Sequence, residues 1–291
     1  MTDLTGIAVR DFDHPALDGY PLSMRLTTPP QPTSAVLVSS GTGFPKGFYN
    51  RVARRLAERG AAVLTYDYRG IAGSRPADLA AMRMDYPDWG RFDIPAAAQA
   101  LSEAFPGLPV LHLAHSVGGH FVGFMPDPGI IARHAFVSVG TGYWGRHHRS
   151  YNPLELFFWH GYGPWSLAQR GFVKGGGLWA GTDLPRGVFE TWKRWCLKPA
   201  YFGDELKEPL RPHAFDAVTA PIRSWIFTDD PIATPRTARD LLQVYPNAAS
   251  DIVVRRPADQ GARRIGHEGA FRAGMEPLWD EIHDWLVAAE R

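Results

Sequence analysis

The sequence is poor in cysteine and has no long apolar run. Cys196 is the only cysteine, so an internal disulfide is excluded and a reducing compartment is the simpler expectation. No run of roughly 18 apolar residues is present, which excludes a membrane-spanning helix. The residues after Met1 also lack the apolar segment of a secretory signal. We therefore expect a cytoplasmic protein.

The sequence also lacks an excess of charge of one sign, internal repeats and low-complexity segments. Its 31 Lys and Arg residues balance 30 Asp and Glu residues, for a net charge of +1. Because no long basic run is present, we expect neither nucleic acid nor an anionic membrane as a partner. With 45% hydrophobic and 21% charged residues, the 291-residue chain has the composition of a globular protein with a large core. The oligomeric state stays open.

Short apolar runs alternate with segments of helical spacing along most of the chain. Residues 7–9 and 22–26 predict a hairpin around Asp18-Gly19. Helices are expected over residues 48–59 and about 271–289, the second interrupted near Pro277. Further buried strands are expected at residues 35–38, 62–66, 111–113, 135–139, 222–227 and 252–254. This alternation predicts an α/β fold: a mostly parallel central sheet with helices on both faces.

The alternation stops between residues 143 and 215. Six of the ten tryptophans lie there: Trp144, Trp159, Trp165, Trp179, Trp192 and Trp195. Such an aromatic content favours an inserted helical cap over a linker. We therefore predict a core of residues 1–142 and 216–291 with a cap of residues 143–215. Trp144, Trp159 and Trp165 are expected to line an apolar substrate pocket, with packing of the cap onto the core as the alternative for each ring.

The most informative local motif surrounds Ser116. Ala114-His115-Ser116-Val117-Gly118 follows an apolar run and has the small-x-Ser-x-small pattern of a nucleophile elbow. In this strand-to-helix turn the serine backbone is strained, and small residues on either side prevent clashes. Ala114 replaces the usual glycine, so the match is partial. We predict that Ser116 is the nucleophile, ahead of its rivals Ser40 and Ser74.

Two partners for the serine follow in the second half of the chain. Asp229 and Asp230 come directly after the predicted strand 222–227, and His267 follows the strand 252–254. A serine hydroxyl is a weak nucleophile near neutral pH, so an imidazole must accept its proton and a carboxylate must orient that imidazole. We predict His267 as the base and Asp230 as the orienting acid. Asp229 remains the alternative acid.

The loop after the strand 35–38 is expected to complete the site. A tetrahedral intermediate requires two backbone N–H donors, one of them from Val117. The second donor is expected from Thr42, with Gly43 as the alternative. Gly43 and Phe44 are also expected to contact the substrate. His115 is grouped with these substrate-contacting residues, although its place in the elbow directs the ring away from the serine proton and favours packing or hydrogen bonding.

Neither a metal nor a cofactor is expected. The spacing of His112 and His115 sends them to opposite faces of a strand, and no acidic companion motif follows. Residues 175–177 are three glycines, but they lack the Lys-Ser/Thr of a phosphate-binding loop.

Together these motifs resemble the α/β-hydrolase superfamily along nearly the whole chain, including its order of serine, acid and histidine. Leu64-Thr65-Tyr66-Asp67-Tyr68-Arg69-Gly70 with Gly73-Ser74-Arg75-Pro76, the Asp230 loop and the His267 loop are most similar to α/β-hydrolases near the serine aminopeptidase and monoacylglycerol lipase groups. The resemblance implies a cofactor-free serine hydrolase that cleaves a small ester or thioester through an acyl-enzyme. Because fold does not fix function, an acyltransferase, a small-peptide or amide hydrolase and a non-catalytic binding module remain alternatives.

Overall fold

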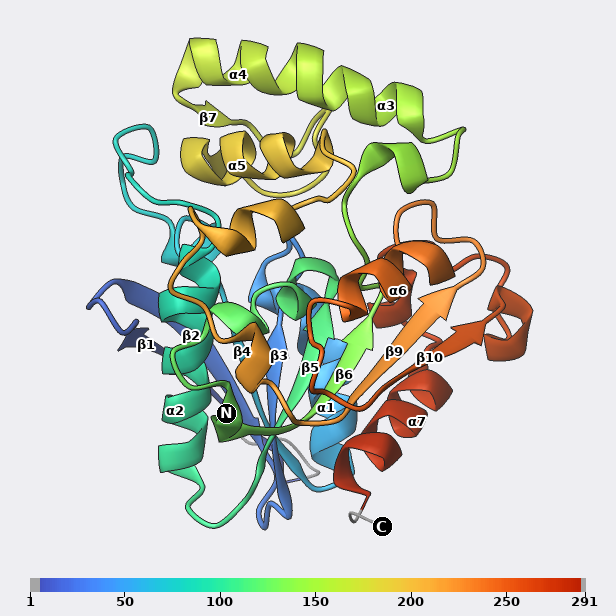
Figure 1. The fold of residues 1–291 in the computed structure, drawn as a ribbon. Coiled ribbons are helices and arrows are strands. Elements are labelled where there is room, and N and C mark those ends of the chain that lie inside the picture. The colour runs from blue at the N-terminus through green and yellow to red at the C-terminus, as the bar shows by residue number, and fades with distance from the viewer. Residues whose placement is uncertain (1–5, 289–291) are drawn as a thin grey trace.

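The centre of the protein is an eight-stranded sheet in the order β1-β2-β4-β3-β5-β6-β9-β10 (Figure 1). It is seen in a computed structural model that describes residues 6–288. The hairpin strands β1 and β2 are antiparallel to each other, β2 is antiparallel to β4, and every other neighbouring pair is parallel. The strands are β1 (Ala8–Pro15), β2 (Pro21–Thr28), β3 (Ser34–Ser39), β4 (Ala61–Tyr66), β5 (Val110–His115), β6 (Ile131–Val137), β9 (Ile222–Phe227) and β10 (Ser250–Arg255).

Helices cover both faces of this sheet because its strands are apolar on both sides. Along β3, Val36 and Val38 face one buried cluster, whereas Ala35 and Leu37 face the other. The first cluster includes apolar residues of α1 (Asn50–Glu58) and α7 (Glu276–Val287). The second includes residues of α2 (Ile94–Ala104) and α6 (Pro235–Leu242). The predicted mostly parallel sheet with helices on both faces is therefore confirmed.

The end of the chain differs in detail from the sequence prediction. Residues 269–271 form a separate 3₁₀ turn, and α7 begins only at Glu276. Pro277 lies in the first turn of α7, where its missing N–H leaves no intrahelical hydrogen bond unmade. The predicted helical start near residue 271 was therefore wrong, and the predicted end at residue 289 lies outside the described residues.

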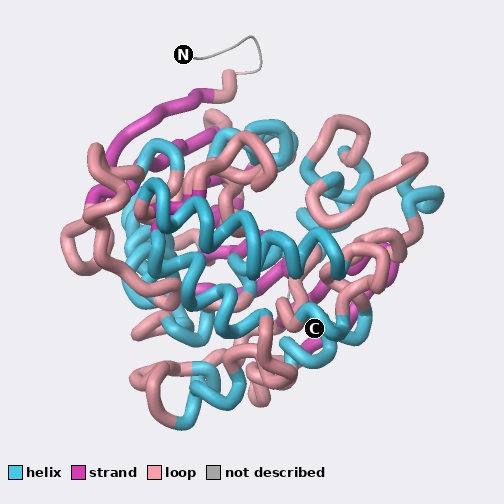
Figure 2. Tube along the Cα trace, turned by 90° about the horizontal axis from the view of Figure 1, so that it is seen from above, coloured by secondary structure: helices cyan, strands magenta, loops and turns pink. Residues whose placement is uncertain are grey.

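Between β6 and β9 the chain leaves the sheet and forms a helical layer above it (Figure 1). Seen from above, helices of this layer cross over the strands (Figure 2). A π-helical turn at Phe158–Tyr162 joins α3 to α4. The layer contains α3 (Asn152–Phe157), α4 (Gly163–Arg170), the short pair β7 (Phe172–Val173) and β8 (Leu184–Pro185), and α5 (Arg186–Cys196). The domain boundaries at 142/143 and 215/216 stay predictions.

None of the helices within residues 6–288 has the length and apolar character needed to span a bilayer.

Candidate active site

The turn that follows β5 has the backbone expected of the elbow motif. Ser116 has a φ of +51°, in the left-handed region that residues with a side chain rarely adopt. Two glycines after it allow close approach of neighbouring segments. A Cβ atom at Gly118 would lie 2.6 Å from the carbonyl oxygen of Ser39, and one at Gly119 would lie 2.7 Å from Val139. The small residues of the motif are therefore required by packing.

The segment after the elbow is not the α-helix that the motif predicts. It consists of two short 3₁₀ turns, Ser116–Gly119 and Val122–Phe124. Glycine is unfavourable in a helix interior by roughly 1 kcal/mol, and three glycines lie within this stretch. The ring of Phe215 packs where a Cβ atom of Gly123 would be, at 2.2 Å. Local sequence and a distant aromatic ring together explain the difference.

Three side chains from separate loops meet at the elbow in one hydrogen-bonded line. His267 Nε2 lies 3.0 Å from Ser116 Oγ. On the other side of the ring, His267 Nδ1 lies 2.9 Å from Asp230 Oδ2 and 3.1 Å from Oδ1. The Asp230 side chain is fully buried, and that of His267 is 19% exposed. The structure thus brings together the serine, histidine and aspartate that the sequence singled out.

The neighbouring aspartates Asp229 and Asp230 have different partners. Asp230 Oδ1 also accepts hydrogen bonds from the N–H groups of Ile232 at 2.8 Å and Ala233 at 3.0 Å. Asp229 Oδ2 instead accepts from the N–H groups of Ile265 at 2.9 Å and Gly266 at 3.0 Å. Asp229 therefore holds the loop that carries His267, whereas Asp230 contacts the imidazole itself.

Solved structures share this arrangement of strands over almost the entire chain. A soluble variant of monoglyceride lipase from Saccharomyces cerevisiae, in complex with a substrate analogue, superposes with a TM-score of 0.63 at 14% identity, covering 99% of this chain and 96% of that chain. An esterase from Pyrococcus furiosus gives 0.59 at 13% identity, covering 97% and 91% respectively. The chain has the α/β-hydrolase fold.

Further comparisons concern the family and other solved structures that the chain is similar to. Residues 30–155 match the family described as serine aminopeptidase S33. The thioesterase domain from the curacin biosynthetic pathway has a TM-score of 0.56 at 15% identity, covering 94% of this chain and 99% of that domain. A search of curated protein sequences found no match. The resemblance stated from the sequence motifs is confirmed.

Burial and charge set the protonation of the Asp230–His267 pair. Burial alone would lower the pKa of the His267 imidazole, but the charge of Asp230 and its hydrogen bond together outweigh burial, so this pKa is raised. Burial alone would raise the pKa of the Asp230 carboxyl, but the charge and hydrogen bond of His267 and two backbone N–H groups lower it. The aspartate is therefore ionised near neutral pH.

His115 lies beneath the elbow rather than in a substrate pocket. Its residue surface is 0% exposed. Its Nδ1 lies 2.7 Å from the Tyr49 hydroxyl, and its Nε2 lies 2.9 Å from the carbonyl oxygen of His267. Burial lowers the pKa of His115 to about 3, so the ring is neutral and Nε2–H donates to that carbonyl. Its grouping with substrate-contacting residues was wrong, because no surface is left for a ligand, while the expected hydrogen bonding is observed.

The loop after β3 lies beside the elbow because β3 and β5 are parallel neighbours, with Ser39 paired to Ala114. The N–H of Thr42 makes no hydrogen bond to any part of residues 6–288, and its hydroxyl bonds that of Tyr86. Gly43 has a φ of +78°, and its carbonyl accepts the N–H of Thr182 at 2.9 Å. The half-buried Phe44 ring lies 5.1 Å from that of His115. This position agrees with a donor at Thr42 or Gly43.

The tryptophans proposed to line a pocket have three different environments. Trp159 is 1% exposed and its Nε1–H donates to Glu155 Oε1 at 3.2 Å, inside the helical layer. Trp165 is 54% exposed on α4, in the outermost layer (Figure 1). Trp144 is half-buried. Trp179, which no sequence pattern distinguishes from the other tryptophans, is the ring that reaches the site loop, since a Cβ atom at Gly43 would lie 2.7 Å from it.

The burial of Trp159 and Trp165 leads to opposite expectations for their alanine variants. Trp159→Ala should lower the free energy of unfolding by about 3 to 5 kcal/mol, because it leaves a cavity among packed rings. Trp165→Ala should lower it by less than about 1 kcal/mol. Urea unfolding measures both values, and ester chain-length preference is measured alongside. A changed preference at full stability in Trp159→Ala would contradict a packing role.

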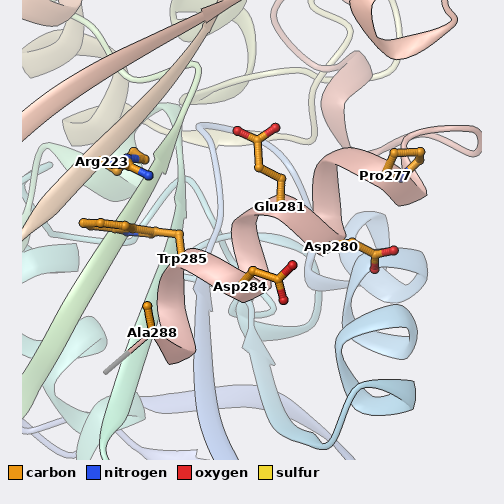
Figure 3. A pocket seen from close by; sticks show the side chains of 7 residues that line it. All are labelled: Arg223, Pro277, Asp280, Glu281, Asp284, Trp285 and Ala288. Atoms are coloured by element: carbon orange, nitrogen blue, oxygen red, sulfur yellow. The ribbon is translucent and has the colours of Figure 1, made fainter. Parts of the chain in front are cut away.

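Two hollows on the surface of the described residues are lined by residues other than Ser116. The larger, of about 640 Å³, is an open depression beside α7 (Figure 3). Its lining is Arg223, Pro277, Asp280, Glu281, Asp284, Trp285 and Ala288. The smaller lies between α4 and α5. Neither contains Ser116, so the predicted apolar pocket above the serine stays a prediction.

Several buried histidines make hydrogen bonds to one another or to neighbouring groups. His112 and His134 face each other with their Nδ1 atoms 3.0 Å apart, so one ring donates to the other. Within residues 6–288, no group of three or more His, Cys, Asp or Glu side chains is arranged to hold a metal ion.

Proposed function

We propose that the protein is a serine hydrolase that cleaves a carboxylic ester or thioester through an acyl-enzyme. The observation that carries this proposal is the line of hydrogen bonds from Asp230 through His267 to Ser116, with Ser116 in a strained turn. A serine hydroxyl 3.0 Å from an imidazole nitrogen has a base in position for its proton. The names of the similar solved proteins, a lipase, an esterase and a thioesterase domain, support the ester and thioester class.

The proposed reaction has two stages with the same proton carrier. Ser116 Oγ attacks the acyl carbon while His267 Nε2 accepts its proton, and Asp230 stabilises the resulting imidazolium. The oxyanion accepts hydrogen bonds from the N–H groups of Val117 and Thr42, or Gly43 in place of Thr42. Collapse breaks the bond to the alcohol or thiol, which leaves with the proton from His267. Water then attacks the acyl-enzyme by the same steps and releases the acid.

A paired assay tests this proposal. An organophosphonate probe should add one adduct per chain, located on Ser116 by peptide mass spectrometry. Turnover is measured on p-nitrophenyl esters of graded chain length and on an acyl-CoA panel. Ester or thioester turnover with a labelled Ser116 is the expected result. Faster acyl transfer to an added alcohol or thiol than to water would favour the acyltransferase, and neither labelling nor turnover would favour a binding module.

The raised pKa of His267 leads to a prediction about pH. Only the neutral imidazole accepts the serine proton, so kcat/KM should fall as the pH drops through this pKa. Because that pKa is raised, the half-maximal point should lie above the ordinary histidine value of about 6.5. A profile of kcat/KM from pH 5 to 9 measures it. A midpoint well below 6.5 would show that burial outweighs Asp230, and a flat profile with rate-limiting chemistry would remove His267 from this role.

A further inference from the structure

One side-chain hydrogen bond attaches the site loop to a distant part of the chain. The hydroxyl groups of Thr42 and Tyr86 are bonded to each other, although 44 positions separate the two residues. Thr42 is 5% exposed and Tyr86 is fully buried. Burial raises the pKa of Tyr86 well above its ordinary value, more than the Thr42 hydrogen bond lowers it, so its hydroxyl keeps its proton at any working pH. Water therefore has little access to this hydrogen bond, and the Tyr86 hydroxyl does not lose its proton as the pH changes.

The ring of Tyr86 lies where three parts of the structure meet. It packs on Phe121, which follows the elbow, with ring centroids 4.8 Å apart. It also packs on Trp195 at 5.6 Å and Trp192 at 6.2 Å, both on α5 of the helical layer. The adjacent Asp85 fixes the backbone, because its Oδ1 accepts the hydroxyl of Thr191 on α5 at 2.5 Å and the N–H of Tyr86 at 2.7 Å. Tyr86 thus has little freedom to move.

A backbone donor stabilises a developing negative charge most when its direction is fixed before the reaction. The N–H of Thr42 receives no orientation from a hydrogen bond of its own within residues 6–288. Its neighbour Gly43 has a positive φ of +78°, and the Gly43 carbonyl accepts the N–H of Thr182 at 2.9 Å, so this hydrogen bond holds the loop after Thr42. The bond to the Tyr86 hydroxyl restrains the Thr42 side chain, which is attached to the backbone that carries the Thr42 N–H.

We infer that Tyr86, packed against Trp192 and Trp195, is a positioning residue for the oxyanion donor at Thr42. This inference rests on the proposed serine hydrolase function. It also commits to Thr42 over Gly43 as the second donor.

The test uses the full chain and removes single hydroxyl groups. Tyr86→Phe should lower kcat and the rate of Ser116 phosphonylation about tenfold, less than the loss of a whole donor, with KM changed less than about twofold. The matched control is Tyr20→Phe, which removes a partly buried hydroxyl that donates to Ser74 O at 2.6 Å, away from the site loop. The control should keep wild-type kcat. Melting temperature is measured for both variants.

A second pair of variants separates positioning from general packing. Thr42→Val keeps the N–H and the shape but removes the hydroxyl, whereas Thr42→Ser keeps the hydroxyl. Thr42→Val should lower kcat about as much as Tyr86→Phe, Thr42→Ser should lower it less than Thr42→Val does, and adding Tyr86→Phe to Thr42→Val should cause no further loss. This pair also decides the case if Tyr86→Phe does not fold.

Two results would overturn the inference while leaving the proposed function intact. One is wild-type kcat in Tyr86→Phe or in Thr42→Val, and the other is an equal loss from Tyr86→Phe in the Thr42→Val background. In both cases the wild-type protein is labelled at Ser116 and turns over ester. A wild-type protein that is neither labelled nor active overturns the proposed function and this inference with it.

Discussion

Ser116→Ala is expected to abolish ester turnover and phosphonate labelling, with a loss in kcat on the order of 10⁶-fold. The reason is that the alanine has no oxygen to form the acyl-enzyme, and His267 and Asp230 then have no proton to move. Because the members of such a triad act as a unit, the loss should be close to that caused by removing all three. The fold should survive, since the hydrogen bond of the Ser116 hydroxyl within the described part of the chain goes to His267 Nε2, a side chain of the site itself.

Ser74→Ala provides the comparison for the Ser116 variant, because Ser74 was a rival for the nucleophile. Its hydroxyl donates to Asp67 O at 2.7 Å and accepts from Ser23 N–H at 2.8 Å, so it is tied into the structure. Its loss should lower the melting temperature and leave kcat of the folded protein unchanged. Measurements of kcat, labelling and circular dichroism on both variants separate the cases. Normal activity in Ser116→Ala would remove Ser116 from the mechanism.

Asp230→Asn is expected to lower kcat by up to about 10⁴-fold. An amide facing His267 Nδ1 donates where the carboxylate accepts. The imidazole then carries its proton on Nε2, the atom 3.0 Å from Ser116 Oγ, and has no lone pair there for the serine proton. The loss should appear in kcat more than in KM, because the substrate does not touch Asp230, whose side chain is fully buried.

Asp229→Asn is the matched control, one residue away and with the same chemical change. The amide oxygen of asparagine can still accept the N–H groups of Ile265 and Gly266, so the His267 loop should keep its place. We expect a kcat loss of less than about tenfold and some loss of stability, since Asp229 Oδ1 is buried without a partner among residues 6–288 and an amide N–H₂ there would be unsatisfied. A larger kcat loss in Asp229→Asn than in Asp230→Asn would reverse the assignment.

The sequence by itself determined most of the sheet and the turn at Ser116. β9 (Ile222–Phe227) has the predicted bounds, and the other predicted strands lie within or overlap the observed ones. These features are local, because apolar runs of strand length and glycines next to a serine restrict the backbone wherever they occur. The order of Ser116, Asp230 and His267 along the chain likewise pointed to their meeting, since loops after neighbouring parallel strands lie at the same edge of a sheet.

Only the tertiary structure decided which of several equivalent residues has which partner. Asp229 and Asp230 are alike in sequence, and their roles separate through contacts with residues about 36 positions later. Trp159 and Trp165 lie six residues apart, yet one is 1% and the other 54% exposed, because burial depends on which helix face meets α5. The Thr42–Tyr86 bond and the Phe215 ring against Gly123 are also contacts over long sequence separations. Such contacts have no local signal, since packing between distant segments fixes them.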